Sequence, residues 1–386
     1  MLKISCIDCV TISLKSMKVF YLDNVASHYR KAIFLLMDKT FEMSYLFGES
    51  LEDIKQMDTS LLKGSVKKTK TINLPADWYW QPGLLKALFN SYDRYLMVCE
   101  SRALSTWVFG LLAFVLGKHK KVFFWSHGWY GKETKLERAM KKVLFRFAGG
   151  GTFVYGNYAR DLMIKEGFSS NKLFTIHNSL DYEQQLRLRN EVKKTDLYTS
   201  HFGNDNKVII LIGRLNERKQ LHLLLEAVKE LSDKNEFYNV VFVGDGSERP
   251  KLETLTNEYG LQNQVWFYGA CYDEMTNASL IYNADICVTP GDIGLTAIHC
   301  MSFGTPCITH DDFPHQGPEF EAIHDGKTGC FYEHGNVASL TEKISKWFKQ
   351  HDDRNEVRQN CYKEVDYQWT PSFQLMVLKE GLNYSA

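Results

Sequence analysis

The sequence predicts an α/β protein with two doubly wound parallel sheets. In both halves of the chain, short apolar runs alternate with segments of helical periodicity, which is the pattern of repeated βαβ units. A polar stretch at residues 181–206, without a sustained strand pattern, separates the halves as a linker. Because ligands of such sheets bind at the carboxyl ends of the strands, we expect the site in the cleft between two facing domains.

Composition excludes several classes of function. The chain of 386 residues is 44% hydrophobic and 24% charged, as in globular rather than disordered or membrane-embedded proteins. Lys+Arg and Asp+Glu are equal at 46 each, and this balance disfavours nucleic acid as a partner. The nine cysteines show no spacing framework, and the pair Cys6 and Cys9 lacks the second half of a zinc site, so we expect reduced thiols in the cytoplasm.

The first domain is predicted at residues 17–200, after an extension at 1–16 that we expect to take no part in the fold. Strands are expected at 18–22, 43–47, 95–99, 122–125, 152–155 and 173–176, and an exposed basic loop at 63–70. Helices are expected at 32–37, 103–117 and 132–147. The apolar segment 103–117 is shorter than the roughly 20 residues of a spanning helix, so we expect it to be buried in the domain.

Helix 132–147 has an apolar side and a strongly basic remainder. The apolar side holds Leu136, Met140, Val143, Leu144 and Phe147, and the basic residues are Lys132, Lys135, Arg138, Lys141, Lys142 and Arg146. Two interpretations follow: a solvated helix over the core, or peripheral contact with an anionic membrane surface.

The second domain is predicted at residues 207–365. Its strands are expected at 208–212, 240–243, 265–268, 286–289 and 307–309, and its helices at 219–231, 249–259, 273–282 and 295–303. The run Val208–Ile212 contains five consecutive apolar residues, which favours a strand buried on both faces.

Two loops of this second domain suit a diphosphate. Gly213 ends the strand 208–212, and the cations Arg214 and Lys219 follow it; an ordinary solvated βα turn is the alternative. In PGDIGLTAIHCMSFGTP (290–306), a glycine-rich turn enters a helix, so the first amides at Gly294, Leu295 and Thr296 form an anion site. Together the two loops would grip a diphosphate from two sides.

The order of motifs resembles the retaining glycosyltransferases of the GT-B fold, in particular the family-four class that builds bacterial surface polysaccharides. The motifs are GRL-x3-K at 213–219, VGDGSERPKLE at 243–253, VWFYGA at 265–270, the 290–306 stretch and EAIHDGKTG at 321–329. The resemblance is dense over 207–348 and thinner in the first half, where it includes SHGWYG.

This resemblance implies a role for several residues. Arg214 and Lys219 would neutralise the donor diphosphate and the leaving nucleotide, together with the amides at 294–296. The loop at Tyr268, Gly269 and Ala270 would line the nucleobase, and His127 would face the transferred sugar, with a hydrogen-bonded strand-end histidine as the alternative. The final helix, at 366–386, would cross back onto the first domain.

The chain departs from the family where two glutamates stand eight positions apart, because Gly291 and His299 occupy these positions. Asp292 would take over hydrogen bonds to the sugar. His299 would bind the ribose or would simply pack in its helix. Asn24 and Arg30 lie on the acceptor side, where they would touch acceptor or phosphate or be solvated. Glu321, before the DGKTG turn, is expected to shape that loop.

The resulting prediction is a cytoplasmic glycosyltransferase, at the inner face of the membrane if helix 132–147 binds lipid. It would transfer a sugar from a nucleotide diphosphate sugar to a saccharide or lipid-linked acceptor with retention. No cofactor and no metal are expected, since the Asp-x-Asp motif is absent and the adjacent side chains of His310, Asp311 and Asp312 diverge. The alternatives are a non-catalytic sugar-nucleotide binder and a nucleotide-sugar epimerase.

Overall fold

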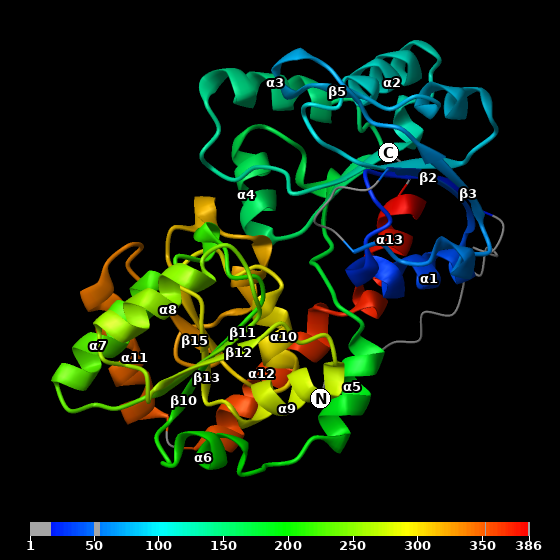
Figure 1. Cartoon of the computed structure of the whole chain (residues 1–386). Helices are drawn as coiled ribbons and strands as arrows, with labels where there is room; N and C mark the ends of the chain where they lie inside the picture. Colours follow the sequence, from blue (N-terminus) through cyan, green and yellow to red (C-terminus); the bar gives the residue numbers. More distant parts are fainter. Residues whose placement is uncertain (1–16, 50–54, 352, 385–386) are drawn as a thin grey trace, which may run out of the picture.

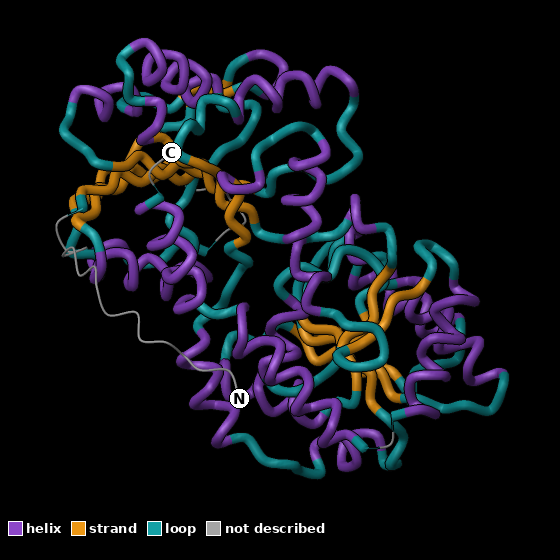
Figure 2. Tube along the Cα trace, turned by 180° about the vertical axis from the view of Figure 1, so that it is seen from behind, coloured by secondary structure: helices purple, strands orange, loops and turns teal. Residues whose placement is uncertain are grey.

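The computed structural model describes residues 17–49, 55–351 and 353–384, which fold into two α/β domains (Figure 1). Each domain has one parallel sheet with helices on both faces, as Figure 2 shows. The predicted fold class of two Rossmann-like domains is therefore confirmed. The expectation for residues 1–16, including Cys6 and Cys9, lies outside the described residues.

The first sheet has seven strands, all parallel. In spatial order they are β3 (Ser65–Thr69), β2 (Glu42–Gly48), β1 (Lys18–Asp23), β6 (Arg94–Val98), β7 (Val122–Ser126), β8 (Gly151–Val154) and β9 (Leu173–Thr175). Strand order reverses between β1 and β6, so the carboxyl ends of these two strands flank the switch point where open α/β sheets bind ligands. An antiparallel pair, β4 (Ile72–Asn73) and β5 (Tyr79–Trp80), lies beside the sheet.

Helices cover both faces of this sheet and bury one core on each. The helices are α1 (Lys31–Thr40), α2 (Leu104–Val115), α3 (Lys135–Phe145), α4 (Asn157–Lys165) and α13 (Pro371–Asn383). One core contains α1 and α13 residues such as Phe34 and Leu378, and the other contains Phe109 of α2 and Leu144 of α3.

The second sheet has six parallel strands. In spatial order they are β12 (Val265–Gly269), β11 (Asn239–Val243), β10 (Val208–Ile212), β13 (Ile286–Val288), β14 (Cys307–His310) and β15 (Gly329–Tyr332). Its helices are α5 (Tyr182–Glu191), α6 (Leu197–Phe202), α7 (His222–Asp233), α8 (Arg249–Glu258), α9 (Glu274–Asn283), α10 (Thr296–Ser302), α11 (Val337–Gln350) and α12 (Arg354–Gln368). The switch point lies between β10 and β13, and all five residues of β10 are buried, as its apolar run predicts.

Local structure differs from expectation at several places. The predicted basic loop at 63–70 contains β3, an edge strand in which only Thr69 is buried, so it lacks the apolar pattern of an inner strand. The predicted linker 181–206 contains α5, capped by Asp181, and α6; their sequences are too polar for the pattern to be seen. Strand β15 was not predicted.

Helix α2 is not the buried helix that its apolar sequence predicts. Phe109, Gly110 and Ala113 face the core, whereas Phe114 and Val115 are 60% and 72% exposed. A Cβ at Gly110 would come within 2.6 Å of the Phe147 side chain. The core-facing side of α2 therefore packs closely because it has small residues.

Helix α3 follows the same pattern beside it. Its Leu144 is buried, but Leu136 and Val143 are 71% and 49% exposed, which corrects the expected apolar side. In the described part of the chain, no helix has the length and apolarity needed to cross a membrane.

The chain crosses back to the first domain at its end. Helix α12 packs on α10 in the second domain, and α13, red in Figure 1, lies beside α1 in the first. The Gln374 amide of α13 donates to the His177 carbonyl and accepts from the Ser179 hydroxyl, which fixes the helix to the segment after β9.

We predict that Leu378→Ala destabilises the protein by about 2–5 kcal/mol, because this fully buried side chain of α13 would leave a cavity in the first core. Denaturant unfolding measures the change. Met376→Ala on the same helix is the matched control: its side chain is 54% exposed, so we expect a change within about 0.5 kcal/mol. Equal effects of the two substitutions would contradict this docking of α13.

Candidate active site

Lys219 joins the two loops that were expected to grip a diphosphate. Its ammonium group donates to the carbonyls of Asp292 (3.0 Å) and Ile293 (3.1 Å) and lies 3.3 Å from the Thr296 hydroxyl. The Gly291 amide donates back to the Lys219 carbonyl at 2.8 Å. The loop after β10 and the turn before α10 are therefore one connected structure at the switch point.

The charged groups of these two connected loops are partly desolvated. Burial lowers the pKa of Lys219, and the charge of Asp292 opposes that shift. Arg214 is exposed at the end of β10, directly after Gly213, whose φ of 136° few other residues adopt. The half-buried Lys219 and the exposed Arg214 and Arg218 thus stand within a single loop.

Gly291, where the sequence resemblance leads us to expect a glutamate, lies in a closely packed position. A Cβ at this position would lie 2.0 Å from the Arg218 carbonyl oxygen, because the 217–219 loop packs directly on Gly291. A glutamate at 291 is incompatible with this arrangement of the loops.

The carboxylate of Asp292 already has partners in the protein. Its Oδ1 accepts from the Gly317 amide at 2.8 Å, and its Oδ2 pairs with Arg218. Its predicted contact with the sugar stays a prediction, but its contacts fix residue 317 beside the turn.

His299 of α10 has a charged partner on the neighbouring helix α9. Its Nε2 lies 3.5 Å from the Glu274 carboxylate, at the start of α9, and this contact lowers the pKa of Glu274. A carboxylate supplied by another helix therefore lies beside the position where the sequence resemblance leads us to expect the second glutamate.

The end of β12, beside which we expect the nucleobase, packs against the end of β11. The Gly244 amide donates to the Gly269 carbonyl at 2.8 Å, and the ring of Tyr268 lies 5.1 Å from that of Trp266. Ala270 follows in the exposed part of this loop.

On the first domain, His127 follows β7 and opens into the cleft. Its ring lies 4.7 Å from the Tyr155 ring and stacks on Tyr130 at 5.8 Å. The surrounding protein lowers the pKa of His127 to about 4, chiefly by desolvation and then by the charge of Arg30. Although the side chain is exposed to the cleft, the ring is therefore neutral at pH 7.

Arg30 is buried, so the expectation that it could be a solvated side chain is wrong. It is 5% exposed, donates to Asp23 at 2.7 Å and lies over the Trp125 ring. Among the described residues its Nη2 has no hydrogen-bond partner. Asn24 is half-buried and donates to Glu100 at 2.7 Å.

Sequence reasoning missed three polar residues of this cleft. Glu319 is 3% exposed and accepts from the amide of Asn178 at 2.9 Å. Gln316 accepts from the Ile293 amide at 3.0 Å and donates to Thr309 at 2.8 Å, so it ties the turn to β14. The signal was HQGPE, a polar stretch between prolines soon after a strand.

Glu321 reaches across to the first domain rather than only shaping its own loop. Its two oxygens accept from the amides of Asn157 and Tyr158 at 2.8 and 2.7 Å, at the start of α4. A side chain at Gly156 would lie 2.3 Å from Glu321, which explains the glycine. Residues of both domains, including His127, Tyr130, Gln316 and Glu321, line the narrow cleft between them.

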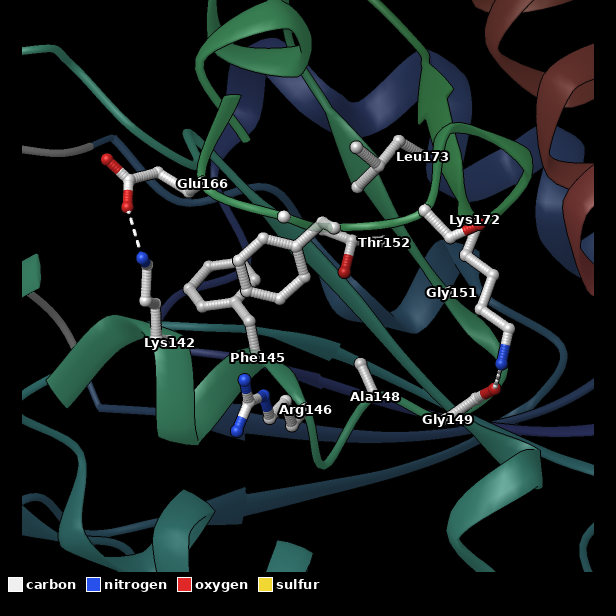
Figure 3. Close-up of a pocket in the computed structure, with 13 residues that line it drawn as sticks. Lys142, Phe145, Arg146, Ala148, Gly149, Gly151, Thr152, Glu166, Lys172 and Leu173 are labelled. Carbon is white, nitrogen blue, oxygen red and sulfur yellow. Dashed lines mark hydrogen bonds and ion pairs between the residues drawn. The ribbon is translucent and has the colours of Figure 1, made fainter. Parts of the chain in front are cut away.

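A larger hollow of about 210 Å³ lies elsewhere, where β8 begins (Figure 3). There Lys142 points to Glu166 and Lys172 to the Gly149 carbonyl, so both cations already have partners. Because it lies at the amino end of its strand, this hollow is not the candidate site.

We predict that Glu319→Gln gains stability relative to the wild type as pH rises. Burial raises the pKa of Glu319 to about 7 from 4.5. The folded protein then holds this proton more tightly than the unfolded chain, so its contribution is complete below pH 4.5 and is lost as pH rises through 7. Glutamine cannot ionise, and the difference should grow by up to about 3 kcal/mol between pH 4.5 and 8.

Denaturant unfolding at several pH values measures this difference. Glu342→Gln on the exposed face of α11 is the control and should show a flat profile. A flat profile for Glu319→Gln as well would mean that the carboxyl titrates normally.

Part of the chain matches a known protein family. Residues 193–364 match the family model described as glycosyl transferases group 1. The alpha-D-kanosaminyltransferase of Streptomyces kanamyceticus is 24% identical over 174 residues, 44% of each chain. The putative glycosyltransferase EpsD of Bacillus subtilis (strain 168) is 27% identical over 177 residues, 45% of each. The matched chain thus spans somewhat under half the length of these relatives.

Solved structures extend the similarity to both domains. Anabaena HepE in complex with UDP has a TM-score of 0.69 at 17% identity, covering 95% of this chain and 99% of its own. The lipopolysaccharide outer core galactosyltransferase WaaB, in its apo form, has a TM-score of 0.69 at 15% identity with the same coverage. Residues 193–364 thus match a transferase family, the group 1 glycosyltransferases, and the two domains together have the GT-B fold of such enzymes.

Proposed function

We propose that this protein is a retaining glycosyltransferase that moves a sugar from a nucleotide diphosphate sugar to a saccharide or lipid-linked acceptor. The observation that carries the proposal is the structure joined by Lys219 at the second switch point, with Arg214 beside it. The group 1 match of the same residues supports it. UDP is the first nucleotide to test, because HepE was solved with UDP and with UDP-glucose.

In this mechanism the bond between the anomeric carbon and the diphosphate breaks, and the leaving group gains negative charge. Arg214, Lys219 and the amides at 294–296 bind this developing charge. They therefore stabilise the transition state more than the ground state. A phosphate oxygen accepts the acceptor's proton on the face where the new bond forms, so the anomeric configuration is kept. His127, neutral at pH 7, hydrogen-bonds the transferred sugar.

The two cations take the place of a metal ion in this proposal. Opposite them, His299 would bind the ribose while Glu274 holds its ring. The acceptor would bind near the carboxyl ends of β1 and β6, where the unpartnered Nη2 of Arg30 and the amide of Asn24 lie. We propose that this chemistry takes place in the cytoplasm and that it serves cell-surface polysaccharide synthesis. The second part is supported by the name of the relative LpsE, a lipopolysaccharide core biosynthesis glycosyltransferase.

We also propose peripheral contact with an anionic membrane through residues 132–147 and the neighbouring helix α2. Exposed Phe114, Val115 and Leu136 supply an apolar surface, and exposed Lys135 and Arg146 supply positive charge at its edge. This combination is typical of proteins that lie on anionic lipid.

A non-catalytic sugar-nucleotide binder is the second candidate, because Gly291 and His299 replace the paired glutamates of the family. Slow hydrolysis of a nucleotide sugar without acceptor would favour the enzyme. Nucleotide binding without turnover on any acceptor extract would favour the binder.

We predict that Arg214→Ala lowers turnover roughly 100-fold or more and weakens binding of the preferred nucleoside diphosphate, because charge stabilisation of the leaving group is lost. Calorimetric titration with UDP, GDP, ADP and dTDP, followed by donor hydrolysis, measures both. Arg187→Ala on the exposed face of α5 is the matched control and should leave both unchanged. Unchanged turnover in a folded Arg214→Ala protein would refute the assigned role.

We predict that liposomes rich in phosphatidylglycerol carry the protein upward in flotation and that Lys135→Glu/Arg146→Glu reduces this binding several-fold. The reason is that each Lys or Arg near an anionic membrane surface contributes about 1 kcal/mol to binding. Lys343→Glu/Lys346→Glu on α11 is the control with the same change of charge. Binding that ignores lipid charge, or equal loss in both variants, would contradict contact through this surface.

A further inference from the structure

The carboxylate of Glu319 lies close to the turn at 292–296 before α10, although the sequence analysis did not predict it there. Its side chain folds over Gly317: a Cβ on that glycine would lie 2.8 Å from Glu319 Oε2, 3.2 Å from Asp292 Oδ1 and 3.3 Å from the Gly294 Cα. The carboxylate, Asp292 and the start of the 294–296 turn therefore converge on one point.

Connections on both sides fix that position. Gln316 and Asp292 bind the segment 316–317 to the turn, through the Ile293 and Gly317 amides. From the first domain, Asn178 donates to Glu319 at 2.9 Å, and both side chains are buried. The carboxylate is thus held between the phosphate loops and the first domain.

Charged and titratable groups surround Glu319 from both domains. Asp292 and Lys219 act on it from the second domain with opposite signs. Its own charge reaches Tyr29 and Tyr155 of the first domain. Its carboxyl group accepts hydrogen bonds from the Asn178 amide and from its own backbone amide, and a carboxylate can accept further donors.

A sugar can supply such donors. Adjacent hydroxyl groups of a hexose donate hydrogen bonds to carboxyl oxygens, and these bonds favour the ionised form of Glu319, whose pKa burial raises to about 7. The position of the first family glutamate is closed, since the Arg218 carbonyl fills the space above Gly291. Glu319 approaches the same turn from another segment.

We propose that Glu319, positioned by Asn178, binds hydroxyl groups of the sugar in the nucleotide diphosphate sugar. This inference rests on the proposed function, because it assumes that the neighbouring loops hold the diphosphate. It assigns Glu319 to the sugar and not to the nucleotide. Loss of Glu319 should therefore weaken binding of the nucleotide sugar but not of the bare nucleotide.

The test compares each nucleotide with its sugar conjugate: UDP with UDP-glucose, GDP with GDP-mannose, ADP with ADP-glucose and dTDP with dTDP-glucose. Calorimetry measures affinities for wild type, Glu319→Ala, Glu319→Gln and Asn178→Ala. For the pair that wild type binds, we expect Glu319→Ala to weaken the sugar conjugate 10-fold or more while the bare nucleotide changes less than twofold. Glu319→Gln, which can still accept from Asn178, should lose less, and Asn178→Ala a few-fold.

Each other outcome has a definite meaning. Equal loss of nucleotide and conjugate would show that Glu319 supports the phosphate loops or the fold, and would overturn the inference. No loss of either in Glu319→Ala would overturn it as well, while leaving the proposed function intact. Failure of wild type to bind any of the eight compounds would overturn the proposed function, and this inference with it.

Discussion

The site depends on one partly buried ammonium group. Lys219 donates to two carbonyls of the 292–296 turn, and this contact sets the distance between the loop after β10 and the turn before α10. Burial lowers the pKa of Lys219, so its charge is costly in the empty protein and is compensated by these carbonyls, by nearby Asp292 and, in our proposal, by a diphosphate. Such a cation is preorganised: it needs no rearrangement when a leaving group gains charge beside it.

The close packing of this loop also determines which side chains can surround it. Because the 218–219 backbone lies directly on Gly291, a carboxylate cannot project from that position. The cleft instead receives its carboxylates from segments farther along the chain or on other helices: Glu319 beside the turn and Glu274 beside His299. The backbone that packs on a motif position therefore restricts which residue can stand there.

The sequence predicted what depends on local pattern. Apolar runs placed β10 within its observed bounds and gave the alternation of both sheets, and glycines with cations identified the loops that Lys219 joins. It could not predict β3, whose edge position allows a polar sequence, or the exposed face of α2, where small residues occupy the core side. The partner of Glu319 is Asn178, 141 positions away, and no local pattern carries that information. Burial of Arg30 against Asp23 likewise depends on the packing around Trp125.

The two interdomain carboxylates link the site to the arrangement of the domains. Glu319 and Glu321 both belong to the 3-10 helix η10 (Pro318–Ala322), and each accepts hydrogen bonds from the first domain, one from Asn178 and the other from the start of α4. In a helix of three residues per turn, positions two apart point in different directions, so the two contacts restrain both the position and the rotation of η10. A relative movement of the domains would break these contacts, whereas Gln316 and Asp292 would still bind the segment 316–317 to the turn. The carboxylate that we assign to the sugar therefore keeps its place beside the turn through the second domain, and Asn178 orients it only when the two domains are together.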